Sequence, residues 1–287
     1  MKPRTLMYLL GFRPKPRTHG FEVRSFNLPK DGRVEYAQWL HPNETEKIMT
    51  QEAVDELRRF LRPGDVAIDI GAHTGDSTLP MALAVGSTGC VLALEPNKFV
   101  FPVLEKNSQL NLDKAHIIPL MFAATPADGE YEFEYSDSGF CNGGRHEEIS
   151  KWRHAHAFQL LVQGRNLESY LSNQYPRLVP KIKYIKVDAE GYDFTILTTL
   201  TRLISECKPY IKAEVYKHTT HTQREQLFQF LTGHRYAIYR VESESHYEAQ
   251  RVEMAALMQW RHFDIFCIPE ENTRANAPEP GRPSQER

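Results

Sequence analysis

Val66-Ala-Ile-Asp-Ile-Gly-Ala-His-Thr-Gly75 is the stretch that decides the fold. Its first half is a short, largely apolar run, typical of a buried strand, and it delivers Asp69 to the end of that strand. Gly71 and Gly75 then allow a tight turn into a helix expected at residues 77–85. Glycine permits close approach of a ligand to the backbone, and a helix N-terminus offers free N–H groups to an anionic group. The stretch therefore predicts a strand–turn–helix ligand loop.

Strands and helices alternate along most of the chain. Short apolar runs predict strands at residues 66–70, 90–94, 117–122, 184–188, 210–216, 236–241 and 263–268. Helical spacing of apolar residues predicts helices at residues 45–61, 77–85, 99–110, 165–171, 194–205 and 222–231. This alternation predicts an α/β fold, a mostly parallel sheet with helices on both faces. Such sheets bind ligands at the carboxyl ends of their strands, so chemistry is expected just after Ile70, Leu94 and Val187.

The two ends of the chain lack this alternation. Residues 21–27 and 33–40 predict a hairpin, so we assign residues 1–50 to an N-terminal extension made of a short helix and that hairpin. Residues 51–269 form the main domain. Residues 270–287 lack large apolar side chains and are rich in Pro, Glu, Asn and Arg, which predicts a disordered tail.

Two further motifs place carboxylates at the ends of strands. Glu95 follows the strand at residues 90–94, where a carboxylate is able to accept two hydrogen bonds from ribose hydroxyls. Asp188 and Glu190 close the strand of Ile185-Lys-Val-Asp-Ala-Glu-Gly191, at the predicted ligand edge. The same two residues would also suit a helix N-cap and a first-turn partner of the helix dipole, and the sequence leaves that alternative open.

A nicotinamide cofactor is disfavoured by the glycine loop itself. A dinucleotide-binding G-x-G-x-x-G motif that begins at Gly71 needs glycine at positions 73 and 76, where this chain has His73 and Asp76. Asp76 also adds a negative charge where a pyrophosphate would lie. An NAD-dependent oxidoreductase is therefore a weaker hypothesis than a protein that binds another nucleoside.

Taken in order, these blocks resemble the FkbM family of methyltransferases. The resemblance runs from about Glu52 to Pro269 and rests on Ile68–Gly75, Glu95-Pro96, Ala123-Ala124, Asp128-Gly129, Leu167–Leu171, Lys186–Gly191 and Glu214. It implies a Rossmann-like class I methyltransferase sheet of seven mostly parallel strands, the last one antiparallel, and S-adenosylmethionine (SAM) as cofactor. It also implies O-methylation, often of sugars or other hydroxyl-bearing natural products. His73 departs from the Asn often found in this family, and Tyr192 from a smaller residue.

The resemblance also implies which residues bind the cofactor. They are Asp69, Gly71, Ala72, His73, Thr74, Gly75, Glu95, Pro96, Asn97 and Asp188. Within this set, Glu95 would hold the ribose, and Asp188 would lie near the transferred methyl group. Asn97 and Lys98 would lie beside the adenosine, and Phe99 is a candidate to pack on the adenine ring.

Methylation of a hydroxyl requires a base that accepts its proton. The candidates at the predicted cleft are Asp188, Glu190, Glu214, His218 and His221, and we place the first four in the catalytic site. Histidine has the most suitable ordinary pKa, although two histidines in a polar stretch before a helix also fit an exposed surface. The same four side chains are possible ligands of a hard metal ion, but no spacing is diagnostic and we predict no metal.

The polar segment Ser138–Arg145 is a candidate acceptor loop. Its glycines permit motion, and Asn142 and Arg145 supply hydrogen-bond donors for the hydroxyls or carboxylates of an acceptor. A connecting loop without a binding role is the alternative. The acceptor-side prediction therefore depends on two residues of a single loop.

The composition of the chain limits the classes of binding partner that we expect. The chain is 41% hydrophobic and 25% charged, with a formal net charge of −2, so it lacks the basic surplus that nucleic-acid binding requires. Four widely spaced cysteines fit neither a zinc site nor a dense disulfide framework, which favours the cytoplasm. The basic residues within positions 1–20 allow peripheral contact with an anionic membrane surface. No run is long enough to span a membrane.

The sequence therefore predicts a SAM-dependent methyltransferase that acts on a hydroxyl of a saccharide or similar small molecule. A SAM-binding module without catalysis and a methyltransferase acting on nitrogen are the alternatives. The identity of the acceptor and the oligomeric state lie beyond the sequence.

Overall fold

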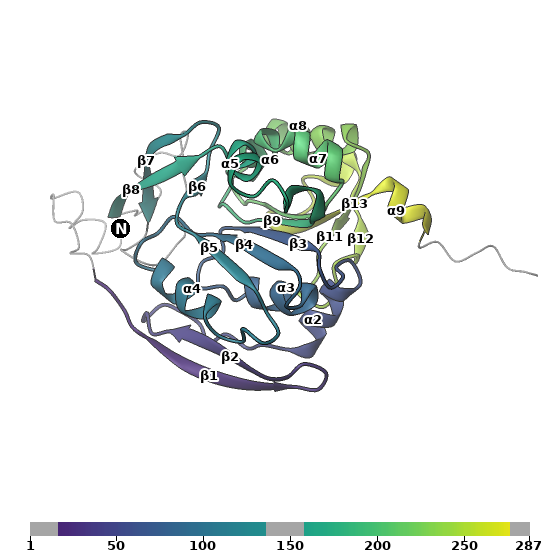
Figure 1. Cartoon of the computed structure of the whole chain (residues 1–287). Helices are drawn as coiled ribbons and strands as arrows, with labels where there is room; N and C mark the ends of the chain where they lie inside the picture. Colours follow the sequence, from purple (N-terminus) through teal and green to yellow (C-terminus); the bar gives the residue numbers. More distant parts are fainter. Residues whose placement is uncertain (1–16, 136–157, 276–287) are drawn as a thin grey trace, which may run out of the picture.

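The computed structural model describes residues 17–135 and 158–275, which form a layered α/β structure (Figure 1). Its large sheet has the strand order β12-β11-β13-β10-β9-β3-β4-β5. The strands are β3 Val66–Ile70, β4 Cys90–Leu94, β5 Ile117–Leu120, β9 Ile182–Val187, β10 Tyr210–Val215, β11 Tyr236–Arg240, β12 Gln250–Arg251 and β13 Phe263–Pro269. The seven expected strands are all present, and the two-residue β12 adds an eighth at the edge.

Most neighbouring strands in this sheet run parallel. β13 differs from them, since it pairs antiparallel with both of its neighbours, β10 and β11. The sheet is therefore the mostly parallel one that the alternation of elements predicts, with an antiparallel last long strand. Its order places the carboxyl ends of β4, β3, β9 and β10 next to one another at one edge.

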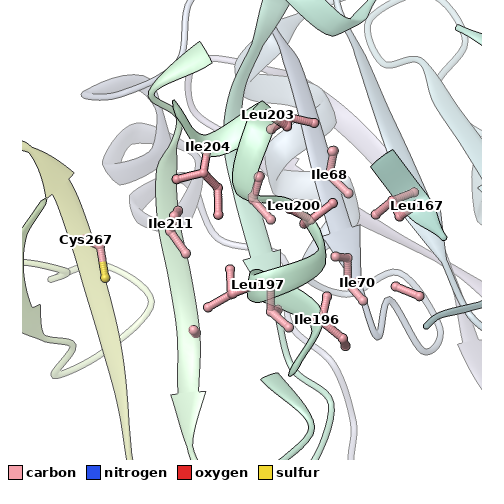
Figure 2. Packing of buried hydrophobic residues seen from close by; sticks show 14 of the residues in the cluster. Ile68, Ile70, Leu167, Ile196, Leu197, Leu200, Leu203, Ile204, Ile211 and Cys267 are labelled. Carbon is pink, nitrogen blue, oxygen red and sulfur yellow. The ribbon is translucent and has the colours of Figure 1, made fainter. Parts of the chain in front are cut away.

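Helices cover both faces of the sheet (Figure 1). One face is covered by α5 Leu167–Gln174, α6 Asp193–Thr199, α7 Thr201–Cys207 and α8 His221–Gly233, and the other by α2 Gln51–Arg58, α3 Thr78–Val85 and α4 Phe101–Ser108. Figure 2 shows how α6 and α7 bury Leu197, Leu200 and Ile204 against the sheet beside Ile68 and Ile211. No helix among the described residues is both long and apolar enough to cross a membrane.

Two smaller sheets flank the large one. The strands β1 Phe21–Leu28 and β2 Gly32–Trp39 form the expected hairpin, which packs on α4 through buried Ala37 and Trp39. A three-stranded sheet contains β6 Ala123–Ala124, β7 Gly129–Tyr135 and β8 Phe158–Arg165. Neither β6 nor β8 was predicted from the sequence. Two short 3₁₀ helices, Val179–Lys181 and Met254–Ala256, complete the connections.

Several expected helices differ in their bounds from those observed. The helix expected from residue 45 begins only after its N-cap Thr50, because the side chain of Gln38 holds the preceding segment extended through Lys47 N and Thr45 O. The helix expected at residues 194–205 is divided into α6 and α7 at Leu200. The helix expected from residue 165 starts after Asn166, whose side chain accepts a hydrogen bond from Ser169 N.

The first residues of the expected tail are helical. Glu270–Ala275 forms a helix, α9, where the composition predicts disorder, because these residues continue directly from β13 and contact β11 and β13. The short helix expected in residues 1–16 lies outside the described residues, as do the remaining tail and the segment with Asn142 and Arg145.

Candidate functional site

A cavity of about 570 Å³ lies along the carboxyl edge of the large sheet. Gly71 after β3, Glu95 after β4 and Asp188 after β9 all line it. This is the edge where open α/β sheets bind ligands, and the volume lies within the usual range for a small-molecule site. The cavity therefore joins the ends of three strands that are far apart in the sequence.

Gly71 is required at the turn after β3 for two independent reasons. Its φ of +83° is in the left-handed region, which L side chains rarely adopt. A Cβ at this position would also lie 2.1 Å from the backbone oxygen of Asp188, closer than any real contact. Gly71 N donates to Leu94 O at 3.1 Å. The glycine thus allows three strand ends to meet at the cavity.

Asp69 stabilises the glycine loop through side-chain hydrogen bonds. It is fully buried, and its Oδ2 accepts hydrogen bonds from Ser77 Oγ at 2.8 Å and Thr78 Oγ1 at 2.6 Å. Its Oδ1 lies 3.4 Å from Lys186 Nζ. Because these contacts tie the end of β3 to the start of α3, Asp69 fixes the loop and does not itself line the cavity.

Glu95 faces the cavity with a nearly buried carboxylate. Its Oε2 accepts from His73 N at 3.0 Å and its Oε1 from Asn97 N at 2.7 Å. Burial raises the pKa of Glu95 to about 7, although the two backbone hydrogen bonds oppose that shift. Each carboxylate oxygen retains further capacity to accept, which fits a diol such as that of ribose.

His73 connects the N-terminal hairpin to the same loop. Its φ is +49°, its imidazole lines the cavity, and its ring meets that of Trp39 edge-on at 5.6 Å. Burial lowers the pKa of His73 to about 4, so the imidazole is neutral at pH 7. Beside it, Thr74 Oγ1 and Tyr36 Oη form a buried hydrogen bond of 2.6 Å. The hairpin therefore supports the glycine loop directly.

The residues proposed to bind the cofactor lie together but in two layers. Gly71, His73, Glu95, Pro96 and Asp188 line the cavity. The others lie behind that surface and are buried: Asp69, Ala72, Thr74, Gly75 and Asn97.

The flanking adenosine candidates lie away from the cavity lining. Phe99 packs against the cluster of β7 and β8, and Lys98 is exposed with its Nζ 5.5 Å from the ring centroid of Phe99. Phe122, Ala124 and Phe133 are among the apolar residues that line the cavity instead.

Two of the four proposed catalytic residues line the cavity. Asp188 has a half-exposed side chain 3.3 Å from Lys186 Nζ. Glu190 is half-buried with a φ of +52°, and burial together with the nearby Asp188 raises its pKa to about 7. A left-handed non-glycine residue beside a cavity is a frequent sign of a functional site.

Glu214 lies behind these two carboxylates and does not line the cavity. Burial, followed by repulsion from Asp188 and Asp193, raises its pKa to about 9. Asp193 is buried, accepts from Gly191 N and Glu214 N, and has a pKa raised to about 8, mainly by burial.

The two histidines proposed as bases are exposed and outside the cavity lining. His218 meets the ring of Tyr216 edge-on, and His221 pairs with Glu225 on α8 at 3.2 Å. A different histidine, His262, lies 3.3 Å from Glu214. Among the described residues, no group of three or more His, Cys, Asp or Glu side chains is arranged to hold a metal ion.

Sequence reasoning missed several charged residues of the cavity. Lys186 lies between Asp69 and Asp188, and although burial lowers its pKa, these carboxylates hold it well above the ordinary value. Lys47 pairs with Asp76 at 2.7 Å on another wall. The position of Lys186 within a buried strand could have indicated its pairing with Asp69 and Asp188, since a buried charge needs a partner.

The fold and the cavity define a Rossmann-like α/β protein with a nucleoside-sized site at the edge of its sheet. A family model described as the methyltransferase FkbM domain matches residues 69–246, more than half of the chain. The chain belongs to this family of SAM-dependent methyltransferases. The glycine turn and the carboxylate of Glu95 fit that cofactor.

Solved structures show only distant similarity. An FkbM methyltransferase from Methylobacillus flagellatus is 16% identical with a TM-score of 0.45, and the match covers 71% of this chain but 44% of that one. A SAM-dependent O-methyltransferase from Thermotoga maritima is 12% identical with a TM-score of 0.42, over 90% and 95% of the two chains. No curated protein matches the chain significantly.

Proposed function

We propose that the protein transfers a methyl group to a hydroxyl oxygen of a saccharide or similar small hydroxylated molecule. The observation that carries the proposal is the pair of carboxylates, Asp188 and Glu190, on the same cavity wall as the glycine turn. When bound, SAM supplies an electrophilic methyl carbon. An alcohol acceptor must lose one proton, and this wall offers groups that accept it.

Glu190 is the better base of the two. Its pKa, raised to about 7 by burial and by Asp188, leaves a substantial fraction ionised at neutral pH and keeps the carboxylate more basic than an exposed one. Asp188 is instead engaged by Lys186, whose Nζ lies 3.3 Å from Asp188 Oδ2. Asp188 therefore orients the acceptor, and Glu190 removes the proton.

We infer that adenine occupies the part of the cavity beside Phe122, Ala123, Ala124 and Phe133. Their apolar side chains suit a purine ring. Glu95 would hold the ribose, and Gly71 and Asp188 would lie beside the methionine part of SAM. The bound cofactor would supply its methyl group to an acceptor held at the carboxylate wall.

The test combines binding with transfer. Calorimetry with S-adenosylhomocysteine (SAH) measures the cofactor site, and labelled-methyl transfer is then screened over matched acceptors that carry a hydroxyl, an amine or neither. We expect label on hydroxyl acceptors and a fall in kcat of about 100-fold in Glu190→Gln, the usual size of a lost general base. Label on amines alone would contradict O-methylation, and SAH binding without transfer to any acceptor would indicate a binding module.

A further inference from the structure

Carboxylates crowd the end of the cavity next to β9 and β10. Asp188, Glu190 and Asp264 line it, and Glu214 and Asp193 stand behind them on neighbouring elements. Their mutual influence is evident at Glu214, whose pKa is raised first by burial and then by the four other carboxylates. Five acidic groups thus share one small volume.

The lysines at this end do not balance the acids. Lys186 is shared between Asp69 at 3.4 Å and Asp188 at 3.3 Å. Lys212 is likewise shared between Glu244 at 2.5 Å and Asp264 at 3.6 Å. Each buried ammonium therefore faces two carboxylates, and an excess of negative charge remains when all are ionised.

Two further basic side chains near the cluster are exposed. Lys217 faces Glu190 from the solvent side, and its charge lowers the pKa of that carboxyl only slightly against burial and Asp188. His262 lies 3.3 Å from Glu214 Oε1 with about half of its side chain exposed, at 49%. Exposed charges are screened by water and salt, so they offset the buried acids weakly.

One oxygen of the cluster has no partner. Glu214 Oε2 is buried, in a side chain that is only 9% exposed, and it makes no hydrogen bond to any residue that the structure describes. A buried acceptor without a partner is costly. Burial and the neighbouring carboxylates raise the pKa of Glu214 to about 9 and that of Glu190 to about 7, so near pH 7 Glu214 is protonated and Glu190 is partly protonated. A positive charge placed in the cavity beside them would favour ionisation.

We propose that this carboxylate cluster selects for the positive charge of the methyl donor, so that the site binds a sulfonium more tightly than the neutral thioether product and releases a proton when it does. The inference rests on the cofactor orientation of the proposed function. Coulomb attraction across a few ångströms of partly buried site is strong enough to separate the two ligands, which otherwise share the same nucleoside and amino-acid groups. This preference for the sulfonium would favour release of the thioether product after each transfer.

The test compares three nucleosides by calorimetry near pH 7, in two buffers of different ionisation enthalpy. SAM carries the sulfonium, sinefungin carries a protonated amine in its place, and SAH carries neither. We expect SAM and sinefungin to bind about tenfold more tightly than SAH, the effect of one favourable charge contact. Only the two cationic ligands should show a binding heat that depends on the buffer, because only they displace a proton.

Variants separate the charge effect from the fold. Glu190→Gln and Glu214→Gln should remove most of the preference for SAM over SAH and leave SAH affinity unchanged. Glu206→Gln is the matched control, since Glu206 is exposed near the end of α7, just before β10 begins at the opposite edge of the sheet. It should preserve the preference.

The outcomes distinguish this inference from the proposed function. If none of the three nucleosides binds, the cofactor site itself is wrong. If all three bind equally and without dependence on the buffer, or if the control variant lowers the preference as much as Glu190→Gln does, charge selection is wrong and the proposed function stands.

Discussion

The two ends of the cavity satisfy their polar groups in opposite ways. At the ends of β3 and β4, Asp69 accepts two hydroxyl hydrogen bonds and Glu95 accepts two from backbone N–H groups. At the ends of β9 and β10, Glu190 and Glu214 face other carboxylates, and one oxygen of Glu214 has no partner among the described residues. At the first end these carboxylates are already paired, although Asn97 Nδ2 is buried without a hydrogen bond to any residue that the structure describes. The second end is left short of positive charge.

This difference suits the first end of the cavity to nucleoside binding and the second end to proton transfer. A site whose hydrogen bonds are already made is preorganised and binds its ligand with little rearrangement. A cluster of carboxylates with raised pKa values instead changes its protonation when a ligand arrives, which is what proton transfer requires. We therefore expect changes at the first end to weaken nucleoside binding, and changes at the second to alter turnover and pH dependence.

Gly71→Ala should give the largest effect. The methyl group would occupy a left-handed residue with φ +83° and lie 2.1 Å from Asp188 O, so the strand ends would have to separate. We expect SAH affinity to fall about 100-fold or more and the free energy of unfolding to fall by about 3 kcal/mol. Calorimetry and urea unfolding measure the two quantities.

Gly32→Ala is the control for this substitution. Gly32 also has a left-handed φ, +70°, but a Cβ there meets no atom within 4 Å. It should lose stability through backbone strain alone and keep its affinity for SAH. Equal loss of SAH affinity in both variants would mean that the contact between the ends of β3 and β9 does not shape the site.

Glu95→Gln should come next in size. The amide cannot accept from both His73 N and Asn97 N, and it removes the charge that would hold the ribose hydroxyls. Loss of charged hydrogen bonds predicts SAH affinity about 30-fold weaker. Glu105→Gln, on an exposed position of α4, should bind SAH as the parent does. Unchanged affinity in Glu95→Gln would remove the ribose assignment.

The sequence predicted the first end of the cavity well because its pattern is local. A strand, a glycine turn and a helix follow one another within residues 66–85, and Glu95 closes the next strand. The register of β3 against β4 then brings the two together without further information. The fold class could be predicted for the same reason, since alternation of strands and helices defines it.

The second end depends on contacts between distant parts of the chain. Lys186 pairs in register with Asp69 on one side and Lys212 on the other, and Asp264 comes from the antiparallel β13. No local spacing shows that these charges meet. The candidate bases His218 and His221 lie outside the cavity lining for the same reason, because the turn after β10 leaves both side chains on the surface.

Glu214→Gln should change the pH dependence of stability. Burial and four carboxylates raise the folded pKa to about 9 from an ordinary 4.5, so the folded state holds a proton that the unfolded state releases. The free energy of unfolding of the parent therefore falls with rising pH across this interval, by about 1.4 kcal/mol per pH unit from this group.

The glutamine variant lacks that contribution, so its stability should decline less steeply between about pH 5.5 and 8.5 in urea unfolding. Glu190, Glu95 and Asp193 have raised pKa values too and should keep part of the slope in the variant. Identical slopes in the parent and the variant would show that Glu214 is ionised in the folded protein.

Tyr36→Phe should give the smallest effect and tests whether the hairpin belongs to the first end. It removes the 2.6 Å hydrogen bond to Thr74 Oγ1 while keeping the buried ring, so unfolding should cost about 1 kcal/mol less. A double-mutant cycle of Tyr36→Phe with Thr74→Val separates the energy of this hydrogen bond from that of general packing. A coupling energy near zero would mean that the hairpin merely covers α4, whereas a coupling accompanied by weaker SAH binding would make it a structural part of the cofactor loop.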